Sequence, residues 1–311
     1  MITNKKTEKI CAVSIMQQRN KDIKFIGVPF RSGANREGTQ LAPKWLIEHM
    51  SLPEEVCSHL QFKTEDTPLS DTEINGVKNY NAVLRMISAV RTEVLTAISN
   101  RKKAVIVGGD HSIAIGSITG VLECFPNLGV IWFDAHTDIN TEASSPSGNA
   151  HGMPLAALMG LCDSEINNNS KRLNPANVFW VGARDVDKGE WEIIKRLGIE
   201  DNVYTSEMIH RIDMKVVMND IRTKLKAQGV EHLHLSFDID GMDPLIVQAT
   251  GTPVKMGLNE IGCDTFINEL GTGMPLIISL DFVEYNPMMD DNINSTGGWC
   301  LRTLKQLIDI L

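Results

Sequence analysis

The chain has 311 residues, 42% of them hydrophobic, and its 39 acidic residues outnumber the 30 Lys and Arg to give a formal net charge of −9. This composition is typical of a globular protein, and the acidic balance excludes a globally basic surface for nucleic acid. No stretch of about 18 apolar residues is available to span a bilayer, and the N-terminal segment lacks the apolar core of a signal peptide. We therefore expect a soluble cytoplasmic protein with no membrane or nucleic-acid partner.

Short runs rich in Val, Ile and Phe alternate along the chain with longer segments of helical periodicity. This alternation is typical of repeated β–α units that build a parallel sheet. The predicted strands cover residues 24–30, 104–108, 129–133, 178–182, 232–237 and 276–282.

Apolar residues at helical spacing predict helices around residues 83–97 and 214–225. A last helix is predicted from about Ser295 to the C-terminus, with an inward face made of Leu301, Leu304 and Ile308. No internal repeat or Pro/Ser-rich linker divides the chain. We therefore predict one doubly wound α/β domain over residues 1–311, with a flexible N-terminal segment 1–21.

The six cysteines are scattered and include no C-x-x-C pair. In a chain of this length, that distribution favours reduced and mostly buried thiols over a disulfide framework or a zinc ribbon.

Three clusters of polar residues directly follow predicted strands. They are Gly-Gly-Asp-His-Ser at 108–112, Asp-Ala-His-Thr-Asp at 134–138 and Ser-Phe-Asp-Ile-Asp at 236–240. Alternate residues of an extended segment project to one face, so the acidic and histidine side chains of the second cluster share a face, as do the aspartates of the third. Open α/β sheets bind their ligands beyond the carboxyl ends of the strands, which is where these clusters are expected to meet.

Apart from Asp110, the clusters supply four carboxylates and two imidazoles, from Asp134, Asp138, Asp238, Asp240, His111 and His136. Carboxylates crowded in one crevice repel each other unless cations neutralise them. Two divalent ions would balance the four negative charges, with a hydroxide as a further bridging ligand. The mixture of hard oxygen and imidazole ligands suits Mn²⁺ and is also compatible with Fe, Co or Zn.

Other interpretations of the same residues are structural. A single Asp-x-His-x-Asp run can simply cap a helix, and Asp110 with Ser112 has the pattern of an N-cap pair. Three clusters that each follow an apolar strand favour the two-metal site over capping alone. His234 shares a face with Ser236 and could support the site from beneath, but a hydrogen-bonded core histidine is the favoured interpretation of it and of His232.

Five ordered motifs resemble the ureohydrolase family, and within it the arginases. In addition to the first cluster, they are Asp-Ala-His-Thr-Asp-Ile-Asn at 134–140, Ser-Gly-Asn-Ala-His-Gly at 147–152, Ser-Phe-Asp-Ile-Asp-Gly-Met-Asp-Pro at 236–244 and Ala-Thr-Gly-Thr-Pro at 249–253. The similarity extends over nearly the whole chain. It implies a three-layer α/β/α sandwich with a mainly parallel sheet, and a homo-oligomer that is a trimer or a hexamer.

The resemblance also implies a metal centre and a reaction. Two Mn²⁺ ions per chain would be held by the six residues named above, with Asp134 and Asp238 bridging the pair. A hydroxide that bridges the metals would attack the guanidinium carbon of L-arginine and release L-ornithine and urea. Besides the ligand Asp138, the catalytic residues implied are Glu284, which would receive the guanidinium, and His151, which would carry a proton to the leaving amine.

The substrate assignment comes from loops that resemble those of arginases. The resemblance places Asn140, Ser145, Ser147 and Asn149 at the substrate α-carboxylate. Asp187 would bind the α-amino group, Glu190 would assist through water, and Thr252 would also contact the substrate. By themselves these segments are ordinary polar turns.

Two alternatives remain open. Another ureohydrolase, such as an agmatinase, guanidinobutyrase or formimidoylglutamase, would share the metals and differ in the specificity loops. A catalytically silent arginase-like regulatory protein would be marked by lost metal ligands, and none is lost here.

Overall fold

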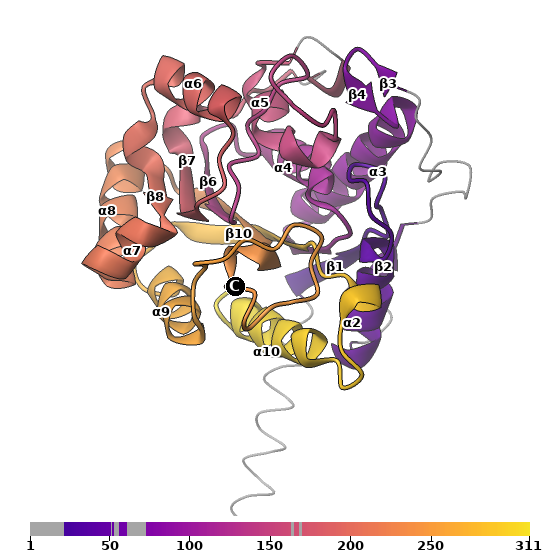
Figure 1. Cartoon of the computed structure of the whole chain (residues 1–311). Helices are drawn as coiled ribbons and strands as arrows, with labels where there is room; N and C mark the ends of the chain where they lie inside the picture. Colours follow the sequence, from indigo (N-terminus) through magenta and orange to yellow (C-terminus); the bar gives the residue numbers. More distant parts are fainter. Residues whose placement is uncertain (1–21, 51, 53–55, 61–72, 163–164, 168–169) are drawn as a thin grey trace, which may run out of the picture.

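An eight-stranded parallel sheet forms the middle layer of the protein, which we describe from a computed structural model (Figure 1). The structure describes residues 22–50, 52, 56–60, 73–162, 165–167 and 170–311. The predicted flexible segment 1–21, which includes Cys11, lies outside the described residues. The strands of this sheet are β1 (Ile23–Gly27), β2 (Cys57–His59), β5 (Lys103–Val107), β6 (Leu128–Phe133), β7 (Val178–Ala183), β8 (Val203–Thr205), β9 (His232–Asp238) and β10 (Leu276–Val283).

The strand order in space differs from the order in the chain. It runs β2-β1-β5-β10-β9-β6-β7-β8, and the neighbouring strands pair in parallel. The carboxyl ends of β5, β10, β9 and β6 therefore lie side by side at the middle of the sheet. A separate antiparallel hairpin is formed by β3 (Glu73–Ile74) and β4 (Val77–Lys78).

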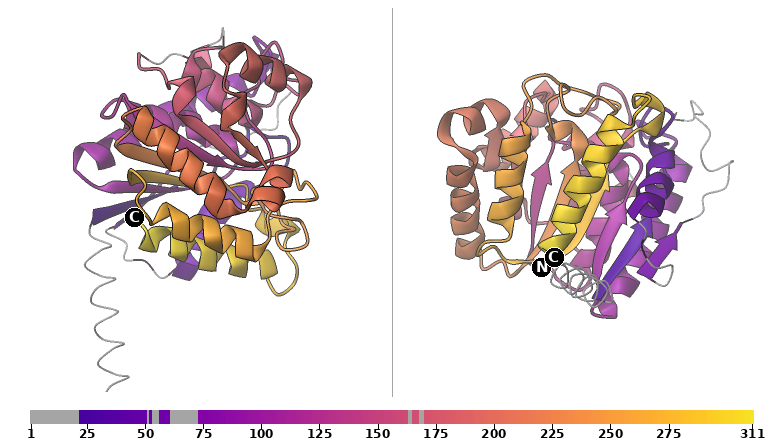
Figure 2. Two further views of the ribbon diagram at one scale, coloured as in Figure 1. Left: turned by 90° about the vertical axis from the view of Figure 1, so that its left-hand side faces the viewer. Right: turned by 90° about the horizontal axis from the view of Figure 1, so that it is seen from below.

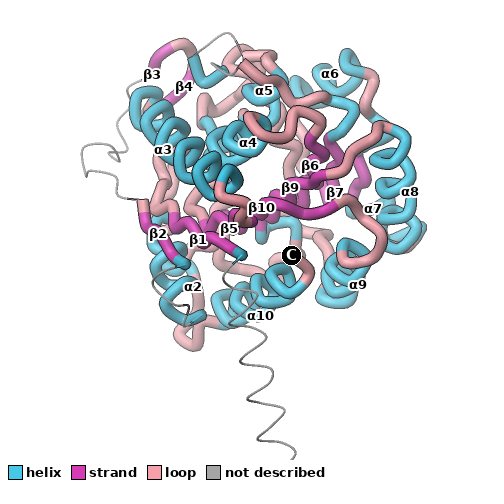
Figure 3. The backbone as a smooth tube through the Cα atoms, turned by 180° about the vertical axis from the view of Figure 1, so that it is seen from behind, coloured by secondary structure: helices cyan, strands magenta, loops and turns pink. Residues whose placement is uncertain are grey.

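Helices cover both faces of the sheet (Figures 2 and 3). One face carries α3 (Tyr80–Ser99), α4 (Ala114–Leu122), α5 (Pro154–Met159) and α6 (Lys188–Leu197), which share one hydrophobic core with the sheet. The other face carries α2 (Ala42–Met50), α7 (Ser206–Ile212), α8 (Met214–Ala227), α9 (Glu260–Leu270) and α10 (Ser295–Asp309) over a second core. The predicted three-layer α/β/α sandwich is confirmed.

The closest helix packing in the first layer depends on small residues. A Cβ atom added at Gly116 of α4 would lie 2.8 Å from the carbonyl oxygen of Ile87 on α3, and one at Gly120 would lie 2.9 Å from that of Arg91. Because α4 follows the first polar cluster almost immediately, this contact fixes the helix that begins beside the site.

Two details differ from the sequence prediction. The short edge strands β2 and β8 were not predicted, because three residues of mixed polarity carry no readable alternation. The inward face of α10 contains Trp299, Cys300, Leu304 and Leu307, whereas Leu301 and Ile308 are only partly buried. The helix is rotated from the predicted orientation because this rotation buries the large Trp299 ring.

The described cysteines form no disulfide, and Cys162, Cys263 and Cys300 are buried. Within the described part of the chain, no helix is both long enough and apolar enough to cross a membrane.

Candidate active site

The three polar clusters meet at the carboxyl ends of neighbouring strands. His111 begins a 3₁₀ turn (His111–Ile113) that follows β5, with Asp110 as its N-cap accepting a hydrogen bond from the Ser112 amide at 3.0 Å. Asp110 therefore caps this turn, as one of the interpretations above proposed. The neighbouring His111 side chain points toward the other polar clusters. Asp134 follows β6, and Asp238 is the last residue of β9.

Two groups of possible metal ligands form around the two histidines. The Nδ1 atom of His111 lies 3.0 Å from Asp134 Oδ2, 3.1 Å from Asp138 Oδ2 and 3.2 Å from Asp238 Oδ2. The Nδ1 atom of His136 lies 3.3 Å from Asp134 Oδ1 and 3.2 Å from an oxygen of the remaining aspartate, Asp240. Asp134 thus belongs to both groups and directs a different oxygen to each one.

The residues fit divalent metal ions. Among the described residues, His111 Nδ1 is buried without a hydrogen-bond partner, although it faces three carboxylate oxygens. The other ring nitrogen, Nε2, lies 2.7 Å from the Ser236 hydroxyl. Imidazole nitrogen and carboxylate oxygen without thiolate form a donor set suited to Mn²⁺ and similar ions. Asp238 belongs only to the His111 group, so its bridging role stays a prediction.

Neighbouring groups fix the orientation of the ligands. The Trp132 ring stacks on the His111 ring with centroids 4.0 Å apart, and its Nε1–H donates to Asp134 Oδ2 at 3.0 Å. The Thr252 hydroxyl donates to Asp240 Oδ2 at 2.9 Å. Such outer contacts fix the rotamer and the tautomer of a ligand before any metal binds.

The cluster has the electrostatics of a cation site. Burial and the nearby Asp134 carboxylate together raise the pKa of Asp138 to about 6. Burial and the charges of Asp240 and Asp134 raise the pKa of Asp238 well above its usual range. Burial would also raise the pKa of Asp134, but the facing imidazoles of His111 and His136 outweigh it and lower that pKa. Bound cations would remove the repulsion that holds protons on these buried carboxylates.

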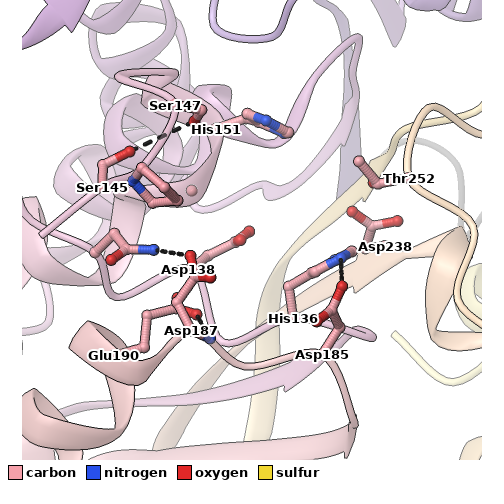
Figure 4. Close-up of a pocket in the computed structure, with 13 residues that line it drawn as sticks. His136, Asp138, Ser145, Ser147, His151, Asp185, Asp187, Glu190, Asp238 and Thr252 are labelled. Atoms are coloured by element: carbon pink, nitrogen blue, oxygen red, sulfur yellow. Dashed lines mark hydrogen bonds and ion pairs between the residues drawn. The ribbon is translucent and has the colours of Figure 1, made fainter.

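A pocket opens above the ligands and contains most of the predicted site residues (Figure 4). Its lining consists of His136, Asp138, Asn140, Ser145, Pro146, Ser147, His151, Gly152, Asp185, Asp187, Glu190, Asp238 and Thr252. Asn149 and Glu284 are outside this lining and are buried next to it. Asp185 also lines the pocket and was not predicted, although its Asp-Val-Asp spacing with Asp187 could have indicated it. The contacts of Ser236 and Trp132 were not predicted either.

His151 and Glu284 approach each other behind the pocket. The distance from His151 Nδ1 to Glu284 Oε1 is 3.6 Å, and the same oxygen accepts the His111 amide hydrogen at 2.8 Å. Burial alone would lower the pKa of His151, but the nearby Glu284 carboxylate, together with the charges of Asp138 and Asp110, outweighs it and raises this pKa to about 8. Glu284 has φ 67°, and Asp138 also has a positive φ, of 48°. Strained residues of this kind persist where the surroundings hold them, often at functional sites.

The predicted specificity residues form one hydrogen-bonded rim. Asn140 Nδ2 donates to Asp187 Oδ2 at 2.9 Å, so the two loops assigned to opposite ends of the amino-acid group touch each other. The Ser145 and Ser147 hydroxyls lie 3.5 Å apart, and Ser147 Oγ accepts the Asn149 amide hydrogen at 3.2 Å. These contacts hold the residues of the rim in a defined arrangement.

Glu190 lies beneath this rim. Its Oε1 accepts the Ile139 amide hydrogen at 3.0 Å and its Oε2 accepts the Asp187 amide hydrogen at 2.9 Å, which ties the two loops together. Burial and the Asp138 charge raise the pKa of Glu190 to about 7. These contacts give Glu190 a loop-fixing position in addition to the water-mediated contact predicted for it.

His234 lies in the core and outside the pocket. Its Nδ1 is 2.7 Å from the Ser279 hydroxyl and its Nε2 is 3.2 Å from the buried Asp281 carboxylate. The favoured interpretation of a hydrogen-bonded core histidine therefore describes this residue.

The chain is similar to known proteins over most of its length. A family model described as "Arginase family" matches residues 21–307. A protein named arginase from Staphylococcus aureus (strain MRSA252) is 36% identical over 283 residues, which is 88% of this chain and 93% of that protein. A protein named arginase from Entamoeba histolytica is 36% identical over 296 residues, which is 93% of this chain and 98% of that protein.

Solved structures agree with these matches. The crystal structure of Entamoeba histolytica arginase in complex with L-ornithine has a TM-score of 0.79 at 34% identity, covering 92% of this chain and 97% of that one. The native arginase from Bacillus caldovelox has a TM-score of 0.83 at 32% identity, with the same coverage of 92% and 97%. A formimidoylglutamase from Bacillus subtilis has a TM-score of 0.72 over 93% of this chain and 86% of that one, and at 17% identity it shows the shared fold alone.

Proposed function

Because the chain belongs to the arginase family and is a ureohydrolase enzyme, we propose that it hydrolyses L-arginine to L-ornithine and urea with two Mn²⁺ ions. The observation that carries the proposal is the juxtaposition of two carboxylate–imidazole groups with a polar pocket directly above them. Relatives named arginase at 36% identity support arginine over other guanidino substrates.

Six side chains would hold the metal pair. The first ion would lie among His111, Asp134, Asp138 and Asp238, and the second among Asp134, His136 and Asp240. We also propose that Asp238 bridges both ions together with Asp134. When bound, two divalent cations supply a water molecule of lowered pKa that can attack the resonance-stabilised guanidinium carbon.

The chain's own residues orient the guanidinium and manage the proton. Glu284 keeps acceptor capacity beyond the His111 amide, since a carboxylate has about four lone-pair sites, and it would receive N–H groups of the substrate. The raised pKa of His151, about 8, favours its protonated form near neutral pH, and from that form it would donate a proton to the leaving amine of ornithine.

The rim would recognise the amino-acid end of the substrate. Asn140, Ser145, Ser147 and Asn149 offer amide and hydroxyl groups for the α-carboxylate, while Asp187 and Glu190 would face the α-amino group. Thr252 reaches the pocket from the opposite wall and would contact the substrate beside Asp240. Agmatine lacks the carboxylate and would leave the rim donors without a partner, which costs binding energy.

The deciding experiment is urea release from L-arginine and from agmatine with Mn²⁺-reconstituted protein. We expect arginine to be turned over at least about 10²-fold faster than agmatine, because agmatine would leave polar groups of the site unpaired. Turnover of agmatine alone would overturn the assigned substrate and keep the metal site. Inactivity on both, followed by release of formamide from formiminoglutamate, would identify a formimidoylglutamase, and inactivity on all three would favour the silent regulatory protein.

We further propose that the protein works in the cytoplasm as a homo-oligomer, a trimer or a hexamer. Light scattering after size-exclusion chromatography would test the assembly, and a mass of 34.4 kDa at micromolar concentration would contradict it.

A further inference from the structure

The Arg184 guanidinium is held in a cage of main-chain carbonyl groups. Its Nη2 donates to the carbonyl oxygens of Asp240 at 2.6 Å, Met242 at 3.1 Å and Val254 at 2.8 Å. Its remaining nitrogens donate to the carbonyl oxygens of Gly182, Gly241, Val254 and Lys255 at 3.0 to 3.2 Å. In the described part of the chain, its hydrogen bonds go to carbonyl oxygens and none to a carboxylate.

These carbonyls belong to three separate segments. Gly182 lies in β7, residues 240–242 follow β9, and residues 254–255 follow the loop that carries Thr252. The last two segments also pair with each other, since Asp243 N donates to Leu258 O at 2.9 Å and Leu258 N to Gly241 O at 3.1 Å. Arg184 therefore closes a junction at which β7, the Asp240 turn and the Thr252 loop converge.

The junction determines the position of one metal ligand. The Asp240 side chain accepts the Ala135 amide hydrogen on Oδ1 at 3.1 Å and the Thr252 hydroxyl on Oδ2 at 2.9 Å, and Oδ2 is also 3.2 Å from His136 Nδ1. Arg184 holds the main-chain oxygen of that same aspartate. It also binds the carbonyl oxygen of Ala135 through its own amide, at 2.8 Å.

We infer that Arg184 is a positioning residue for the Asp134–His136–Asp240 metal group, acting through the main chain of Asp240 and the Thr252 loop. This inference rests on the proposed two-ion function. A planar guanidinium has five N–H donors in a rigid fork, and here they span carbonyls from three segments. A lysine ammonium keeps the charge but has three donors on one atom and cannot reproduce the cage.

Charge is the rival explanation. Burial lowers the pKa of Arg184, while the carboxylates of Asp240 and Asp134 raise it, so its positive charge acts directly on the cluster. If charge were the whole contribution, Arg184→Lys would behave like the wild type. Arg184→Met would then bind cations more tightly, because a like charge is removed from the neighbourhood of the ions.

The test is Mn²⁺ binding by equilibrium dialysis with electron paramagnetic resonance, at a temperature where every variant is folded by circular dichroism. We expect the wild type to bind two ions. Arg184→Lys should bind one ion with unchanged affinity and the second with an affinity about 10- to 100-fold lower, as is typical when a contact that supports a metal ligand is lost. The spectrum should change from a coupled pair to an isolated ion. Arg222→Lys is the matched control, since Arg222 donates to Glu269 at 3.0 Å between α8 and α9, and it should keep both ions.

The outcomes separate the inference from the proposed function. Two ions of wild-type affinity in Arg184→Lys would overturn the inference. No ion in wild type would overturn the proposed function instead. If Arg184→Lys does not fold, Thr252→Val is the second test, because it removes only the loop's hydroxyl from Asp240. Weakened binding of the second ion in that variant supports the inference, and wild-type affinity contradicts it.

Discussion

Asp134 belongs to both groups of the proposed metal centre, because its two oxygens face the two histidines. Replacement of Asp134 by Ala should reduce bound metal below one ion per chain. Urea release should fall by at least about 10³-fold, since metal activation contributes several kcal/mol to the barrier. Metal content by mass spectrometry alongside urea assays measures both effects. Asp220→Ala, on α8 and away from the site, is the matched control, and retention of two ions by Asp134→Ala would refute the ligand assignment.

His151 should affect turnover without affecting the metals. His151→Asn removes the proton donor and should reduce turnover by about 10²- to 10⁴-fold with two ions still bound. A parallel loss of metal would contradict the proton-transfer role.

The pairing of His151 with Glu284 also predicts a pH dependence of stability. A histidine whose pKa rises from 6.5 to about 8 on folding stabilises the protein fully below pH 6.5, and this contribution disappears as the pH rises through 8. The contribution is about 2 kcal/mol in the metal-free protein. Denaturant unfolding of metal-free wild type and His151→Asn should therefore differ near pH 6 and converge near pH 9. A constant difference across this range would show that packing, and not ionisation, distinguishes the two proteins.

The proximity of the predicted metal ligands could be anticipated from the sequence, but the contacts that support them could not. Spacing by two after an apolar strand places Asp134, His136 and Asp138 on one edge, and the structure brings these residues together with His111. The carbonyl cage of Arg184 gave no such signal. The groups that accept its hydrogen bonds are main-chain carbonyls of segments distant in sequence. Every residue type has such a carbonyl, so the sequence does not mark which residues form the cage.

At the scale of elements, buried central strands were predictable and edge strands were not. Strands β5 and β6 are nearly continuous apolar runs, as expected for strands covered on both faces. Strand β10 is mostly apolar but contains Ser279 and Asp281, and β9 alternates polar with apolar residues. The three residues of β2 or β8 resemble any loop, and only their neighbours in the sheet make them strands. The rotation of α10 likewise depends on the residues that pack against it, and the periodicity of a single helix carries no information about them.

Two helical glycines allow a matched test of the packing between α3 and α4, because one lies at this contact and the other lies on α10 in open space. An alanine Cβ at Gly116 would meet the Ile87 carbonyl at 2.8 Å, whereas one at Gly298 of α10 would meet nothing within 4 Å. Gly116→Ala should therefore destabilise the protein by about 1–3 kcal/mol through overpacking. Gly298→Ala should stabilise it by up to about 1 kcal/mol through helix propensity. Urea unfolding at constant m-value measures both, and equal effects would show that α3 and α4 separate easily.

At the scale of the whole molecule, metal binding should be coupled to stability. The chain carries a net charge of −9, and part of that charge is buried at the centre of its sheet. A ligand at 100 times its dissociation constant stabilises a folded protein by about 2.7 kcal/mol. Removal of metal by a chelator should lower the melting temperature by several degrees, and Mn²⁺ should restore it. Asp134→Ala should show no such response, and an equal rise in that variant would indicate binding elsewhere.

The strand order determines at which point during synthesis the site can form. Strand β10 is the last strand of the described chain, yet it lies between β5, which leads to His111, and β9, which ends in Asp238. On the ribosome, every predicted metal ligand is therefore translated before the strand that lies between them. A nascent chain that has reached residue 260 contains all six predicted ligands but not β10. We therefore expect the proposed metal ions to bind after residues 276–283 have been released, and a chain that stops earlier to bind them poorly.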